Sequence, residues 1–243
     1  MNSLFLFRLT LDFVAAGLLL IGLSYWWLGN ALHEAAGTGM FVLLIAHNLF
    51  NRRWFGAAFR PRRDARGTLN TGATLVLLIT MLTLLVTSAV ISNTLTKWIP
   101  HRPSFTIRQL HVLAAYWALV IVAIHLGFRW PMIMGVARTL CGISTPSKVR
   151  TLALRIVAAA VALHGVWSSF ALGLGTRLTM QVSLDWWNFE DSVTGFFVHC
   201  VAIAGLCIAA TYYAMGWRKT SYLSRLRKAS TTTPSAGECR RLG

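Results

Sequence analysis

Apolar residues fill six long segments of this chain, and short polar segments separate them. Each apolar segment has about twenty residues or more, the length of helix that crosses a hydrocarbon core about 30 Å thick. We predict membrane-spanning helices over 9–29, 31–51, 69–95, 106–130, 151–174 and 193–217. The pattern therefore predicts an all-α integral membrane bundle of six transmembrane helices.

Composition agrees with this class and bears on the partners. The chain has 243 residues, of which 56% are apolar, and a formal charge of +16. In a soluble protein that charge would suggest nucleic acid. Here the cations alternate from loop to loop, and no charge-rich module with interleaved aromatics separates the apolar segments. Membrane lipid, and not nucleic acid, is the expected surrounding.

Lysine and arginine concentrate in the loops on one side of the predicted bundle. That side holds Arg52, Arg53, Arg60, Arg62, Arg63, Arg66, Arg129, Arg138, Lys148 and Arg150, followed by the basic tail. The other side holds only Lys97, Arg102, Arg108 and Arg177. Cytoplasmic loops carry the excess of positive charge in membrane proteins, so both termini are predicted to be cytoplasmic. We interpret the first apolar segment as a retained helix, because it is long for a signal-peptide core.

Two of the predicted helices carry the same histidine pattern. His33 and His47 lie fourteen positions apart in the second helix, and His111 and His125 repeat that spacing in the fourth. Fourteen residues turn a helix to about 40° short of four full turns, so the two histidines of each pair lie on one helix face. The same fourteen residues rise about 21 Å, which places one histidine near each membrane surface. Counting spans makes the two helices parallel. His33 is therefore expected beside His111 at the outer level, and His47 beside His125 at the inner level.

Two histidine pairs stacked across a membrane are the ligand set of two b-type haems. A haem also needs small residues beside its edge and cations for its propionates. Gly37 fits the first need, with Arg108 on the outer side and Arg52, Arg53 or Arg129 on the inner side for the second. Structural histidines and two separate two-ligand metal sites are the alternatives. Ionisable side chains inside a membrane usually mark function, and two equally spaced pairs favour haem.

The strings LHEAAGTGMFVLLIAHNLFNRRWF and RQLHVLAAYWALVIVAIHLGFRW carry a family resemblance. The spacing of their histidines resembles that of di-haem b-type cytochromes of the respiratory and ferric-reductase-like kind. The longer strings resemble a bacterial family of small membrane cytochromes of unassigned function. The likeness covers about residues 1–130. It implies a four-helix di-haem core in a bacterial inner membrane. The residue pattern, and not the resemblance, predicts 131–217 as two additional transmembrane helices and 218–243 as a basic, disordered cytoplasmic tail.

Two more intramembrane histidines lie outside this core. His164 is expected near mid-depth of the fifth helix, and His199 nearer the outer surface in the sixth. Three interpretations remain open: histidines bonded within the core, a quinone site or proton relay, and a third haem. Their different predicted depths argue against the third haem. Glu34, beside His33, is expected either to carry protons or to be solvated at its helix start.

The function expected from these features is transmembrane electron transfer through two bis-histidine b haems. The chain would be the membrane cytochrome subunit of an oxidoreductase, exchanging electrons with quinone or a peripheral redox protein, as a homodimer or within a larger complex. A stand-alone quinol-dependent reductase of an outer-face oxidant or ferric iron is the alternative. A haem-free transporter or scaffold is a third interpretation. No nucleotide- or flavin-binding segment is recognisable, which favours a subunit over a self-contained enzyme.

Overall fold

The computed structural model describes residues 3–58, 65–96, 104–182 and 187–232, and these form helices joined by turns and loops. Six of the helices are long and apolar enough to cross a membrane. They are α1 (Ser3–Leu23), α2 (Tyr25–Phe50), α4 (Ala65–Ile91), α6 (Phe105–Leu140), α7 (Lys148–Ala171) and α9 (Val193–Thr232). The predicted all-α class with six candidate spans is confirmed, and the chain is a multi-pass membrane protein.

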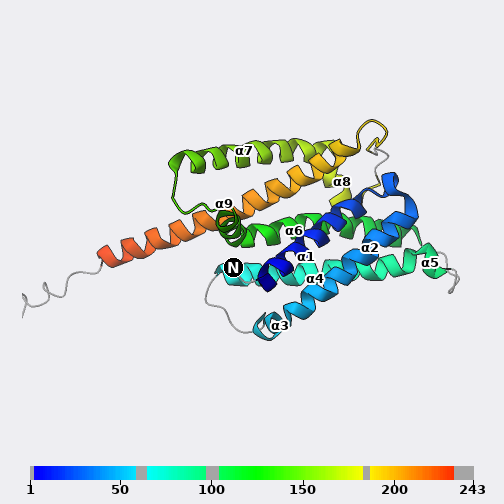
Figure 1. Ribbon diagram of the computed structural model, residues 1–243, viewed down its shortest axis with the longest axis horizontal. Coiled ribbons are helices and arrows are strands. Elements are labelled where there is room, and N and C mark those ends of the chain that lie inside the picture. The colour runs from blue at the N-terminus through cyan, green and yellow to red at the C-terminus, as the bar shows by residue number, and fades with distance from the viewer. Residues whose placement is uncertain (1–2, 59–64, 97–103, 183–186, 233–243) are drawn as a thin grey trace, which may run out of the picture.

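The long helices run alternately up and down the bundle, so that α2, α6 and α9 share one direction (Figure 1). Three short helices lie at the ends. One end holds α3 (Arg52–Ala58), and the opposite end holds α5 (Asn93–Thr96) and α8 (Leu174–Leu178). These are called the α3 end and the α5 end below. The parallel course of α2 and α6 places their first histidines at the α5 end and their second histidines towards the α3 end.

Two apolar clusters hold the bundle together, and α6 belongs to both. In the first cluster, side chains of α1, α2, α4 and α6 meet around Leu19, Phe41, Leu84 and Ala118. In the second cluster, Leu119 of α6 packs with Leu172 and with α9 residues that include Cys200 and Ile203. The first four long helices therefore share one core, and α6 joins that core to α9, on which α7 packs.

The beginning of α2 differs from the sequence-based expectation. The first predicted helix extended to residue 29, but α1 ends at Leu23, where Ser24 Oγ donates to the Ile21 carbonyl. The non-helical residue within α2 is Gly29, whose φ of 70° is accessible to glycine at low cost. Asn30 follows this kink, and its side-chain Nδ2 donates to Glu34 Oε1 at 3.1 Å. The hydropathy pattern could not locate the turn because both sides of it are apolar.

The bounds of α6 also differ from those predicted. Its N-cap is Ser104, whose Oγ accepts from the Ile107 amide, and not Thr106. The helix continues ten residues beyond its predicted end at 130, because Pro131 does not stop it. Arg66 Nη2 donates to the Phe128 carbonyl at 2.8 Å, next to the turn that Pro131 disrupts. The proposed boundary between residues 130 and 131 thus falls inside one helix.

Helix α9 continues well past the predicted span end at residue 217. It reaches Thr232, so residues 218–232 of the predicted tail are helical here. This segment contains neither glycine nor proline, and Pro234 is the first residue that opposes a helix. The rest of the predicted tail, 233–243, lies outside the described residues, as do His101, Lys97 and Arg102.

Candidate functional site: the intramembrane histidines

The structure brings His33 of α2 together with His111 of α6 at the α5 end. Their ring centroids lie 6.0 Å apart, with the ring planes at 71°. Two imidazoles that bind one metal ion, each through a nitrogen about 2 Å from it, have ring centres about 6 Å apart. The observed separation is compatible with a shared metal ion and also lies in the range of ordinary edge-to-face ring contacts.

A narrow cavity of about 40 Å³ adjoins this histidine pair. Both imidazoles line it, together with Gly22 of α1, Gly37 of α2 and Ala115 of α6. A Cβ added to Gly22 or Gly37 would meet no described atom within 4 Å, so open space borders both backbones. Gly127, in contrast, packs against Thr211 of α9, because an added Cβ would lie 2.6 Å from the Thr211 Cβ. Gly37, the small residue predicted beside a haem edge, therefore borders the cavity.

Threonines of α4 contact both histidines of α6 through Nδ1. Thr87 Oγ1 lies 2.7 Å from the Thr83 carbonyl oxygen and 2.9 Å from His111 Nδ1. A Thr87 hydroxyl that donates to the Thr83 carbonyl is placed to accept from Nδ1–H of His111. Thr74 repeats the arrangement, 2.8 Å from the Asn70 carbonyl oxygen and 3.3 Å from His125 Nδ1. In that arrangement Nε2 of each ring would keep its lone pair for a metal ion.

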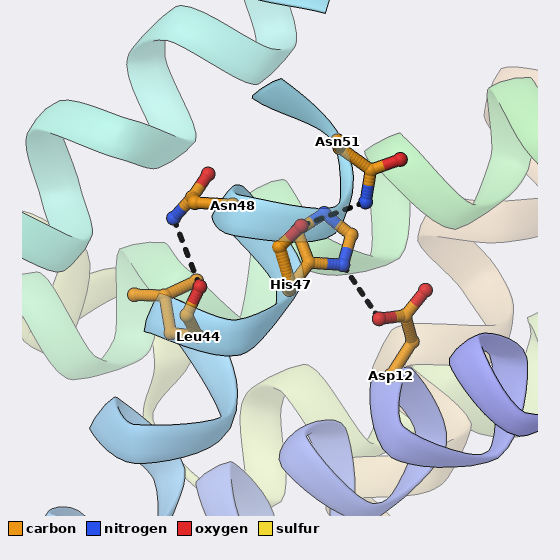
Figure 2. Close-up of polar contacts among 5 residues, drawn as sticks. All are labelled: Asp12, Leu44, His47, Asn48 and Asn51. Atoms are coloured by element: carbon orange, nitrogen blue, oxygen red, sulfur yellow. Dashed lines mark hydrogen bonds and ion pairs between the residues drawn. The ribbon is translucent and has the colours of Figure 1, made fainter. Parts of the chain in front are cut away.

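His47 meets an acidic side chain through the same ring nitrogen. Asp12 of α1 pairs with His47 Nδ1 at 2.5 Å, and Figure 2 shows this contact. The carboxylate accepts the Nδ1 proton. The end of α2 is fixed beside it, because Asn51 Nδ2 donates to the His47 carbonyl and Asn48 Nδ2 to the Leu44 carbonyl. Metal-binding histidines typically carry such an acceptor on the other ring nitrogen.

Sequence reasoning did not assign these acceptors. Asp12 was recognisable as an acid within an apolar span, and Thr74 and Thr87 lie thirteen residues apart on α4, close to the histidine spacing. The partner of each acceptor depends on how the helices pack, which the spacing alone does not determine. His33 differs from the others, because its buried Nδ1 lies near the Gly22 backbone without an ordinary hydrogen bond to any described residue.

His33 and His111 form the first histidine level, and the second level, His47 and His125, lies towards the α3 end. The four residues are called the histidine ladder below. His125 is within electrostatic range of His47, Asp12 and Arg129. One turn further along α6, Arg129 lines a cavity of about 360 Å³ with Arg66 and Asn70. The Asn70 Oδ1 is buried and has no hydrogen-bond partner among the described residues. This end of the bundle thus offers two guanidinium groups beside the His125 level.

The remaining predicted cations are exposed. Arg108 is in the first turn of α6, one turn before His111, and Arg52 begins α3. Glu34 serves a third purpose that the sequence did not suggest. Its carboxylate accepts from the Asn93 amide at 2.9 Å and from Thr94 Oγ1 at 2.6 Å. These bonds tie the His33 turn of α2 to α5.

His164 of α7 and His199 of α9 also come together. Their ring centroids are 5.6 Å apart and their planes differ by 17°, so the different depths expected from the sequence are wrong. Ser168 Oγ lies 2.8 Å from His199 Nδ1, and both side chains are buried. A third haem is opposed by packing instead: a Cβ on Gly165 would lie 2.4 Å from the Ala202 carbonyl oxygen. Helices in such close contact leave no room for a macrocycle between His164 and His199.

The described residues contain no group of three or more His, Cys, Asp or Glu side chains arranged as a metal site. Compared with protein-family models, with curated proteins and with solved structures, the chain gives no match. Fold and site together define an all-α, multi-pass membrane protein with paired histidines between its helices.

Proposed function

We propose that the chain transfers electrons across a membrane through two b haems. His33 and His111 would ligate the haem at the α5 end, and His47 and His125 the haem towards the α3 end. With the positive-inside orientation, the α5 end faces outwards and both termini face the cytoplasm. The observation that carries the proposal is the common contact of His47, His111 and His125, whose Nδ1 atoms face Asp12, Thr87 and Thr74 on neighbouring helices.

This hydrogen bonding is typical of metal-binding histidines, which place the second ring nitrogen against an acceptor. It is not unique to them, because His199 makes the same contact to Ser168. What sets the four proposed ligands apart is their repeated fourteen-residue spacing on two parallel helices. The 6.0 Å separation of the His33 and His111 rings agrees with this assignment. Haem, when bound, would supply one-electron oxidation and reduction at iron.

The chain's own residues would set the position and the potential of each haem. Arg66 and Arg129 are suited to bind propionates at the level of His125, as Arg108 is at the level of His111. Gly22 and Gly37 would border the macrocycle near the outer pair. The cavity of about 40 Å³ there is smaller than a haem, so lining side chains such as Leu18, Leu23 and Met40 must change rotamer to admit it.

The proposed role is that of a membrane cytochrome subunit that exchanges electrons with quinone or a peripheral redox protein. A stand-alone quinol-dependent reductase of an outer-face substrate uses the same two haems and differs only in its acceptor. Reconstitution distinguishes these roles from a haem-free scaffold. Purified protein is expected to show two low-spin b haems per chain in a reduced-minus-oxidised spectrum. In liposomes it should pass electrons from an external reductant to enclosed ferricyanide. A preparation that folds without haem would contradict the proposal.

Substitution of Asp12 is expected to affect one haem and spare the other. Asp12→Asn removes a negative charge and a strong acceptor from His47, so the midpoint potential of the His47–His125 haem should rise and its affinity should fall about tenfold. Thr87→Val is the matched variant, because it removes the corresponding acceptor from His111. Redox titration of each variant should therefore shift a different haem. Equal shifts of both haems in either variant would contradict the assignment of the two levels.

A further inference from the structure

We propose that the histidine pair of α7 and α9 is a quinol-oxidising site facing the outer leaflet. This proposal rests on the proposed function, because the electrons must pass to its haems. The site consists of His164, His199, Trp167 and Trp187, with Ser168 behind it. None of these side chains is among the four proposed haem ligands.

The two imidazoles and the two indoles form one contact cluster. The Trp167 ring lies 5.3 Å from His164 and 5.0 Å from His199, and the Trp187 ring lies 5.1 Å from His199. His199 is 6% exposed, whereas Trp167 is 59% exposed on the outer surface of α7. An aromatic side chain thus separates the buried His199 and the half-buried His164 from the surrounding lipid, at a helix pair on the rim of the bundle.

The surrounding structure fixes these groups. Trp187 Nε1 donates to the Ser192 carbonyl at 2.7 Å, and Gly195 closely contacts the Trp187 ring. Ser168, which is completely buried, orients the His199 ring through Nδ1. The close approach of α7 and α9 at Gly165 holds His164 against His199. Such an arrangement excludes a haem but suits a flat ring that enters from the lipid beside Trp167.

The chemistry of the cluster matches a quinol. Aromatic side chains bind flat rings by stacking, and imidazoles hydrogen-bond hydroxyl groups and accept their protons near neutral pH. Oxidation of one quinol to a quinone breaks two O–H bonds and releases two protons and two electrons. The electrons pass to the two ferric irons of the proposed function, one to each. The protons pass to the imidazole nitrogens in turn, because two charged rings 5.6 Å apart repel each other.

The position of the cluster provides a route for the protons and a route for the electrons that quinol oxidation releases. Each proton can leave through the loop before α9, which carries exposed Glu190 and Asp191. For the electrons, ring contacts run from Trp187 to Phe196, then Phe197, and from Phe197 to Trp27 of α2 at 6.0 Å. Tyr25 lies in the same first turn of α2, and its ring is 5.2 Å from His33. The site is therefore beside the outer haem level.

The test uses the full chain in detergent with a short-chain quinol and its quinone. His164→Gln and Trp167→Ala change the site, and Trp167→Ala alters an exposed side chain that the fold does not need. Trp217→Ala is the matched control, because Trp217 is an exposed tryptophan at the other end of the α9 span. Quinone binding is measured by equilibrium dialysis, and haem reduction by quinol is followed in a stopped-flow spectrometer, with dithionite giving the total haem.

Both site variants are expected to weaken quinone binding and slow quinol-driven reduction about tenfold, with total haem and the control unchanged. Reduction and binding at the wild-type level in both variants would overturn the site and leave the electron-transfer proposal intact. A haem-free wild-type chain that still binds quinone, and loses it in the variants, would support the site while refuting the proposed function. Wild-type protein that binds no quinone would overturn the site.

Discussion

Replacement of His111 by alanine is expected to halve the haem content, from two b haems per chain to one. The structure pairs His111 only with His33 among the four ladder histidines, and the ring separation of 6.0 Å is compatible with a shared iron. A haem whose iron loses one of its two imidazole ligands dissociates readily from the protein, or stays bound in a high-spin state. The haem held by His47 and His125 should keep its low-spin spectrum. Pyridine haemochrome assays and reduced-minus-oxidised spectra measure both effects.

His164→Leu is the control for this substitution, because it removes another intramembrane histidine that close helix packing excludes as a ligand. It should leave two low-spin haems per chain. Loss of haem in His164→Leu together with full haem in His111→Ala would show that the two helix pairs had been assigned the wrong way round. His47→Ala should also lose one haem, but the spectrum that remains should be that of the haem held by His33 and His111.

A single methyl group at Gly165 is expected to destabilise the protein. A Cβ there would lie 2.4 Å from the Ala202 carbonyl oxygen and 2.8 Å from the Leu206 Cβ, so backbone atoms would have to move. Overpacking of this kind costs about 1–3 kcal/mol, and Gly165→Ala should lower the free energy of unfolding by that amount. Thermal unfolding in detergent would measure the loss of stability. The efficiency of cross-linking between α7 and α9 would show whether the two helices have moved apart.

Gly72→Ala is the control, because it should leave the free energy of unfolding unchanged or raise it. Gly72 lies within α4, and an added Cβ would meet no described atom within 4 Å. Alanine favours the helix by about 1 kcal/mol over glycine, so this variant should be as stable as the wild type or more so. Destabilisation of equal size at both positions would mean that close contact between α7 and α9 does not explain the requirement at Gly165.

Local pattern was sufficient for the class of protein and for the histidine ladder. Hydropathy over windows of about twenty residues identifies spans because each span is apolar along its own length. The pitch of a helix places His33 and His47 on one face without reference to any other segment. The ends of the helices were less predictable, since Gly29 and Pro131 interrupt the pattern to different extents. A proline stops a helix in one setting and is accommodated in another.

The acceptors of the imidazoles depend on segments far apart in the chain. Asp12 is 35 residues from His47, and Thr74 is 51 residues from His125. No spacing rule predicts which hydroxyl or carboxylate faces which ring, because that depends on the rotation and depth of two packed helices. The same reason explains the error about His164 and His199, whose depths were estimated along two separate helices as though these did not tilt against each other.

The sequence by itself determined that this is an all-α membrane protein of six candidate spans, with two parallel pairs of histidines at matching positions. These properties follow from composition and helix pitch, which act within one segment. Only the tertiary structure decided that His164 meets His199, which side chain faces each Nδ1 atom, and that α7 and α9 pack closely at Gly165. These properties arise between segments, where side-chain shape and the distance between helix backbones decide what fits.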